Sequence, residues 1–193
     1  MATATTVRPL ASLTMPDEGV SRLARQALLV VAGSILMAVS SKISVPFWPV
    51  PMTMQTLALF LIAAAYGRNL AVATMLLYLA EGAIGLPVFS KGGGLAYLAG
   101  PTAGYLLAYP IAAGIVGWAA DRGYDRNPFR LAGAMLVGEI VILGMGAAWL
   151  GYLFGAEKAL AGGVGPFVVV DLVKIALASA LVPALWSLLK KRT

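Results

Sequence analysis

The chain alternates between long apolar runs and short polar links. Six apolar runs stand out, at residues 26–45, 52–66, 69–86, 101–120, 131–155 and 165–189. A helix needs about 20 mostly apolar residues to cross the hydrocarbon core of a bilayer. The run at 52–66 is short, so it spans the bilayer only if it begins within the proline-rich link at 46–51 or is covered by protein. The pattern predicts an all-α membrane protein with six transmembrane helices in one bundle.

The composition supports this prediction and excludes several classes of protein. The chain is 60% hydrophobic and 11% charged, whereas a soluble domain carries about 25% charged residues. It has no cysteine and no histidine, so thiolate catalysis and the commonest metal ligand are excluded, and we expect no metal or cofactor. It also lacks a nucleophile–base set, a phosphate-binding loop for ATP and a basic stretch with interleaved aromatics. An enzyme and a nucleic-acid-binding protein are therefore not expected.

Lysine and arginine are unevenly divided between the two sides that alternating spans would create. Ten of them lie on one side, in residues 1–25, 67–68, 121–130 and 190–193, and three lie on the other, at Lys42, Lys91 and Lys158. The positive-inside rule predicts that the richer side, with both termini, is cytoplasmic. We expect a cytoplasmic tail at 1–25 and a transmembrane domain at 26–193, in the bacterial inner (plasma) membrane. A cleaved signal peptide over the first run is the alternative, and it would leave five spans.

Charged residues inside the apolar runs are costly in lipid and are therefore candidates for function. Glu81, Asp171 and Lys174 are expected to meet in the outer half of the membrane, while Glu139 lies near the middle of its run. Asp171 and Lys174 are three residues apart and can pair on one helix face. The pair is either a structural ion pair or a polar clamp, in which the carboxylate accepts N–H groups and the ammonium donates to a ligand oxygen. For Glu81 or Glu139 taken singly, a structural role is the simpler interpretation.

The predicted outer link between the third and fourth runs is rich in glycine. Lys91 stands beside glycines 92–94, whose backbone N–H groups can converge on an anion. A flexible connector explains the same pattern. Tyr97 belongs to a group of aromatics near this face, which form either an interfacial belt or a surface that stacks on a ring-shaped ligand.

Three segments resemble hallmark stretches of the biotin-uptake (BioY) family. They are residues 49–56 (PVPMTMQT), 82–89 (GAIGLPVF) and 100–106 (GPTAGYL). The resemblance extends from about the first run to the last, with the N-terminal tail outside it, and includes the Asp171-x-x-Lys174 pattern. Members of this family are substrate-binding subunits of energy-coupling-factor transporters. The resemblance implies a six-helix bundle that holds one biotin near its outer face.

The resemblance also implies roles for individual residues. Asp171 and Lys174 would bind the ureido ring of biotin, and Lys91, the glycine-rich link or Gln55 would bind its carboxylate. The full set of binding residues expected is Gln55, Glu81, Lys91, Tyr97, Thr102, Asp171 and Lys174.

Partners follow from the same resemblance. It implies a transmembrane coupling subunit and two ATP-binding subunits, and the small residues Ser34 and Ala38, four apart, are expected to form the docking face. Two other functions stay open. One is a stand-alone ion- or proton-coupled vitamin carrier with Glu81 or Glu139 as the proton site, and the other is a binding subunit of the same architecture for a different vitamin.

Overall fold

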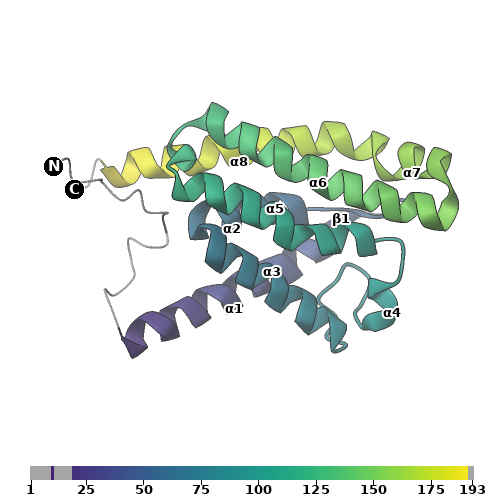
Figure 1. Ribbon diagram of the computed structural model, residues 1–193, viewed down its shortest axis with the longest axis horizontal. Coiled ribbons are helices and arrows are strands. Elements are labelled where there is room, and N and C mark those ends of the chain that lie inside the picture. The colour runs from purple at the N-terminus through teal and green to yellow at the C-terminus, as the bar shows by residue number, and fades with distance from the viewer. Residues whose placement is uncertain (1–9, 11–18, 191–193) are drawn as a thin grey trace.

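The computed structural model describes residue 10 and residues 19–190 of the chain, and each predicted apolar run forms a helix (Figure 1). The helices are α1 (Val20–Lys42), α2 (Gln55–Tyr66), α3 (Arg68–Ala83), α5 (Ala103–Asp121), α6 (Pro128–Phe154) and α8 (Gly165–Lys190). Helix α1 begins six residues before the apolar run that predicted it, so a helix already covers residues 20–25, which the pattern had assigned to the tail.

The connections differ between the two ends of the helical bundle. One end carries the long links, with the hairpin of β1 (Ser44–Val45) and β2 (Met52–Thr53), the short helix α4 (Leu95–Leu98) and helix α7 (Ala156–Gly163). At the other end, one glycine joins α2 to α3, and the 3-10 helix η2 (Tyr124–Arg126) joins α5 to α6. Successive long helices therefore alternate in direction.

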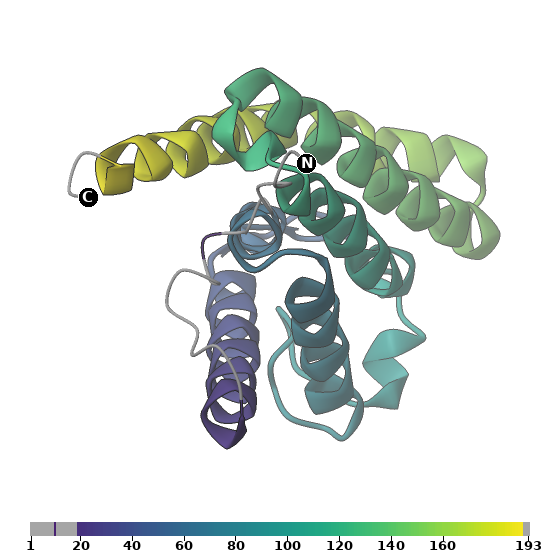
Figure 2. The ribbon, with the colours of Figure 1, turned by 60° about the vertical axis from the view of Figure 1, so that its left-hand side comes forward.

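Within residues 19–190, four stretches are long and apolar enough to cross a membrane. They are Val20–Lys42, Ala103–Asp121, Pro128–Phe154 and Ala156–Leu188. Helix α2 is apolar but has 12 residues, and most of its side chains are covered by protein, as a short buried helix requires. Figure 2 shows α1 and α3 on one side and α6 and α8 on the other, with α2 and α5 between them. The fold is thus a helical membrane protein whose inner helices are α2 and α5.

Glycine permits two close approaches that shape this bundle. Gly67 between α2 and α3 has a φ of 75°, a left-handed conformation that glycine adopts without steric strain. A Cβ atom at Gly117 of α5 would lie 2.6 Å from the backbone nitrogen of Arg68, so the α2–α3 turn packs directly on α5. In α6, a Cβ atom at Gly146 would overlap the ring of Tyr105. The last glycine makes room for an aromatic ring that lines the candidate site.

Candidate functional site

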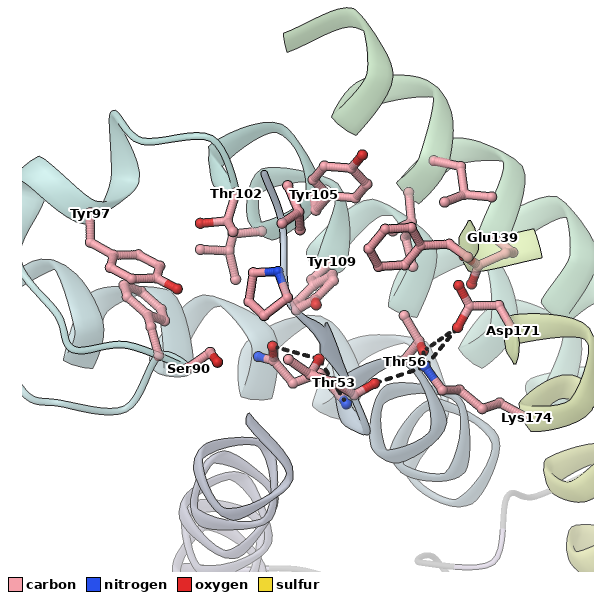
Figure 3. A pocket seen from close by; sticks show the side chains of 18 residues that line it. Thr53, Thr56, Ser90, Tyr97, Thr102, Tyr105, Tyr109, Glu139, Asp171 and Lys174 are labelled. Carbon is pink, nitrogen blue, oxygen red and sulfur yellow. Dashed lines mark hydrogen bonds and ion pairs between the residues drawn. The ribbon is translucent and has the colours of Figure 1, made fainter. Parts of the chain in front are cut away.

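A cavity lies at the end of the bundle that carries the long links. Its walls come from the segment before α2, the first turn of α2, the link between α3 and α5, and helices α5, α6 and α8. About 520 Å³ of space not filled by protein atoms lies at the lining side chains, and this volume includes open solvent at the mouth. Five of the seven predicted binding residues line it, and they are Gln55, Tyr97, Thr102, Asp171 and Lys174. Figure 3 labels the last four of these.

A buried ion pair forms one end of the cavity. The Nζ atom of Lys174 lies 2.7 Å from Oδ1 of Asp171, and their side chains are 6% and 2% exposed. Helical spacing places them one turn apart on α8. Lys174 also donates to the hydroxyl oxygen of Thr56 at 3.0 Å and to the backbone carbonyl of Thr53 at 2.7 Å. The three N–H groups of the ammonium therefore have three protein acceptors.

Thr56 completes this network from the first turn of α2. Its hydroxyl donates to Oδ1 of Asp171 at 3.0 Å while it accepts from Lys174. Oδ1 of Asp171 thus accepts two hydrogen bonds, one from each partner. Such pairing is what makes two opposite charges tolerable in a protein interior. Thr56 ends the segment 49–56 that resembles a family hallmark, but the sequence predicted no role for it, because a threonine at a helix start is common for other reasons.

Glu139 of α6 lines the cavity beside Asp171 (Figure 3). It is 5% exposed, and among the residues that the structure describes no side chain other than Asp171, a second carboxyl group, is a hydrogen-bonding neighbour of its buried oxygens. The sequence marked Glu139 as a charge inside an apolar run but favoured a structural role for it. Depth along each helix could be predicted, whereas the rotation that turns Glu139 toward Asp171 depends on how α6 packs on α5 and α8.

The opposite end of the cavity carries hydroxyl groups and aromatic rings. Ser90, Tyr97 and Thr102 lie there (Figure 3), and the Ser90 hydroxyl is buried with no hydrogen-bond partner in the described part of the chain. The ring of Tyr97 stacks on Phe89 with centroids 5.1 Å apart. Ser90 was missed in the sequence because a single serine in a glycine-rich link has no distinguishing pattern.

The middle of the cavity is aromatic and closely packed. Tyr105 and Phe167 stack with centroids 6.1 Å apart, and the Tyr105 hydroxyl donates to the carbonyl of Gly163 at 2.6 Å. Gln55 is buried at the floor, where its Nε2 donates to the hydroxyl of Tyr78 at 2.7 Å. The cavity therefore combines charged groups at one end, flat rings in the middle and hydroxyl groups at the other end.

Two predicted binding residues lie elsewhere. Glu81 accepts a hydrogen bond from Ser34 and faces a groove on the surface of α1 and α3, so the prediction that it meets Asp171 and Lys174 is wrong. Lys91 is exposed and lies outside the cavity lining. In its place Lys42 reaches the glycine-rich link, where its Nζ donates to the carbonyl of Phe89 at 2.5 Å.

Ser34 and Ala38, the predicted docking pair, have different surroundings because α1 packs on α3. Ser34 is fully buried in this contact, so the prediction that it forms part of an exposed docking face is wrong. Ala38 is half-buried and lines the same surface groove as Glu81. The small residues of α1 let the helix approach α3 closely, since a Cβ atom at Gly33 would lie 2.7 Å from the Thr74 side chain.

The arrangement suits an elongated ligand with N–H donors at one end, a compact ring and a hydrogen-bond acceptor at the other end. The aromatic rings provide apolar contact area for the ligand, and the few polar groups fix the orientation of the ligand. Within residues 19–190, no cluster of three or more acidic side chains could hold a metal ion.

Known proteins resemble this chain over most of its length. The model of the BioY family matches residues 8–191. The match therefore includes part of the N-terminal tail, which the resemblance of the three segments did not cover. A protein of Pyrococcus horikoshii named probable biotin transporter BioY is 38% identical over 156 residues, which are 80% of this chain and 92% of that protein. The biotin transporter BioY of Thermotoga maritima is 34% identical over 154 residues, 78% of this chain and 90% of that protein.

A solved structure shares the fold. It is the S-component for biotin from an ECF-type ABC transporter, with a TM-score of 0.74 over 88% of this chain and 95% of that one. The identity between the two sequences is 22%. At this identity the likeness shows a shared fold and nothing more.

Proposed function

The chain belongs to the BioY family, and from this membership we propose that it captures biotin for uptake across the bacterial inner membrane. Membership makes it a multi-pass membrane transport protein and not an enzyme, with biotin as its ligand and no cofactor. The observation that carries the proposal is the buried pair of Asp171 and Lys174 at the end of a cavity lined by aromatic rings.

The chemistry of biotin supports this proposal. Its cyclic urea offers two N–H donors and one carbonyl acceptor, so it suits the charged end around Asp171. Its fused rings suit the space beside Tyr105 and Phe167, where apolar contact area contributes most of the affinity. Its carboxylate would then reach the hydroxyl groups of Ser90, Tyr97 and Thr102 at the other end.

The topology of the proposed subunit has six crossings and cytoplasmic termini. The 1–25 tail and the links rich in arginine lie inside, and the cavity opens to the outside. The short helix α2 counts as a crossing because protein covers most of it, and the 16-residue helix α3 counts as one because it packs lengthwise on α1 and α5. A reporter that is active only in the cytoplasm, fused after residue 193, should be active. Activity of a periplasmic reporter at that position would refute this topology.

Energy for transport must come from outside this chain, because its sequence has no loop that cradles ATP phosphates. We propose a transmembrane coupling subunit and two ATP-binding subunits as partners. A stand-alone proton-coupled carrier is the second candidate, and the carboxyl group of Glu139, buried in the cavity against that of Asp171, favours it. Uptake of biotin by cells that express this chain alone, measured with and without a proton ionophore, distinguishes the two.

Binding by the purified chain is the first test. Labelled biotin is titrated against the detergent-solubilised protein, with unlabelled biotin, thiamin and riboflavin as competitors. Saturable binding that only biotin displaces supports the proposal. Displacement by another vitamin would instead indicate a subunit of the same architecture with a different ligand.

A further inference from the structure

We propose that Glu139 is the second acceptor for the cyclic urea of the ligand, and therefore a residue that determines specificity. The inference rests on the proposed function, since it assumes a ligand with two urea N–H groups. It names a residue that neither the sequence motifs nor the paired charges of α8 identified.

The first argument is the capacity of the groups around Asp171. The ammonium group of Lys174 donates its three N–H groups to Asp171, Thr56 and Thr53, so no N–H group remains for a ligand. Oδ1 of Asp171 already accepts two hydrogen bonds, which leaves Oδ2 as the acceptor that this residue can offer. One acceptor cannot serve two N–H groups that point away from opposite edges of a five-membered ring.

The second argument is the state of Glu139 itself. A buried polar group without a partner costs free energy, and a carboxyl group is among the most costly. Both of its oxygens are buried, and their one hydrogen-bonding neighbour among the described residues is the carboxyl group of Asp171, which is itself an acceptor for Thr56 and Lys174. Its carboxyl group lies on the cavity wall next to Asp171, from the facing helix (Figure 3). A ligand N–H would satisfy a group that the protein leaves unsatisfied.

The geometry then divides the recognition of the urea between two helices. Asp171 of α8 accepts one N–H, and Glu139 of α6 accepts the other. A vitamin without two N–H groups on a small ring would leave one carboxyl group buried and unpaired, and this is a strong basis for discrimination. The network of Lys174, Thr56 and Thr53 holds Asp171 in place rather than binding the ligand directly.

The test uses two variants and three ligands. Glu139→Met keeps the length of the side chain and removes its oxygens, and Glu139→Gln keeps one acceptor. Each purified full-length variant is titrated with biotin and with two analogues, each methylated at one of the two urea nitrogens. Glu81→Gln is the matched control. It changes a carboxyl group that is also in a helix, but the Glu81 side chain faces the surface groove and not the cavity.

We expect Glu139→Met to weaken biotin binding by about 10- to 100-fold, with a smaller loss for Glu139→Gln. The wild-type protein should discriminate against both analogues, and Glu139→Met should lose discrimination against one of them only. The melting temperature of ligand-free Glu139→Met should equal or exceed that of the wild type, because a buried carboxyl group that faces a second carboxyl group is removed. Glu81→Gln should bind all three ligands as the wild type does.

Three outcomes would overturn the inference. They are unchanged biotin affinity in Glu139→Met, an equal loss for biotin and both analogues, and a lower melting temperature that accounts for the loss. The last two would make Glu139 a structural partner of Asp171. If the wild-type protein itself does not bind biotin, the proposed function is refuted. If the wild type binds biotin and the Glu139 variants bind it equally well, only the inference about Glu139 is refuted.

Discussion

Lys174 of α8 donates a hydrogen bond to the backbone carbonyl of Thr53 at 2.7 Å. The two residues are 121 positions apart in the chain, and their contact joins the last helix to the hairpin that precedes α2. Because the same ammonium is paired with Asp171, one charged group fixes both the acceptor of the cavity and the segment that forms its wall. Stability of the fold and shape of the site are therefore linked at this residue.

Replacement of Lys174 by methionine tests this link. The variant loses three hydrogen bonds and leaves the Asp171 carboxylate buried without its cation, so we expect a loss of about 3 kcal/mol in stability. Thermal unfolding in detergent measures the change, and the exposed Lys158→Met is the control. The double variant Lys174→Met/Asp171→Asn should recover part of the loss, and a double variant no more stable than the single one would contradict the pairing argument.

Replacement of Asp171 by asparagine tests the acceptor role. The charge that strengthens the hydrogen bond to the ligand is lost, and Lys174 is left without a counterion, so biotin binding should weaken by about 2 kcal/mol, or roughly 30-fold. Equilibrium binding of labelled biotin measures this, with Glu81→Gln as the control outside the cavity. Wild-type affinity in Asp171→Asn would remove this residue from the site.

Two glycines of α6 form a matched pair for packing. A Cβ atom at Gly146 would overlap the Tyr105 ring, whereas a Cβ atom at Gly144 would meet nothing within 4 Å. Gly146→Ala should destabilise the protein by about 1–3 kcal/mol and weaken biotin binding, because Tyr105 lines the cavity. Gly144→Ala should stabilise the helix by about 1 kcal/mol without an effect on binding. Equal effects of the two changes would show that the ring does not need the space at Gly146.

The far end of the bundle contains a carboxyl group whose titration should affect stability. Asp125 in η2 is fully buried, and burial raises the pKa of its carboxyl group above the ordinary value of 3.8, although a hydrogen bond from Trp186 at 2.5 Å opposes the shift. The folded state therefore keeps a proton at pH values where the unfolded state has released it. The contribution of Asp125 to stability should rise as the pH falls from neutral through the raised pKa toward 3.8.

Asp125→Asn isolates this contribution. The amide oxygen can still accept from Trp186, but it does not titrate. The difference in melting temperature between variant and wild type should favour the variant most at neutral pH and should shrink as the pH falls. A difference independent of pH between 4 and 7 would mean that Asp125 does not titrate in the way its burial requires.

Much of the architecture follows from the distribution of apolar residues. Every apolar run became a helix, and the short run at 52–66 became the short, protein-covered helix α2. The start of α1 was placed too late, because residues 20–25 are polar enough to resemble a tail yet continue the helix. Spacing along one helix also sufficed for Asp171 and Lys174, since positions three apart share a face whatever surrounds them.

Other parts of the site could not be predicted in this way. Glu81 and Glu139 are both acidic residues inside apolar runs, and depth favoured Glu81 as the partner of Asp171. In the folded protein Glu81 turns toward Ser34, and Glu139 faces the cavity. Which of two such residues enters a cavity depends on the rotation of each helix about its axis, and hydropathy alone does not determine this rotation when nearly every face of a helix is apolar.

The sequence by itself determined that this is a helical membrane protein of the BioY family, with a charged pair in its last helix, because composition, spacing and family motifs are local properties of the chain. Only the tertiary structure decided that all three N–H groups of Lys174 have acceptors in Thr53, Thr56 and Asp171, that Glu139 faces Asp171 in the cavity, and that Ser34 is buried. These are contacts between residues far apart in sequence, and they depend on how the helices pack against one another.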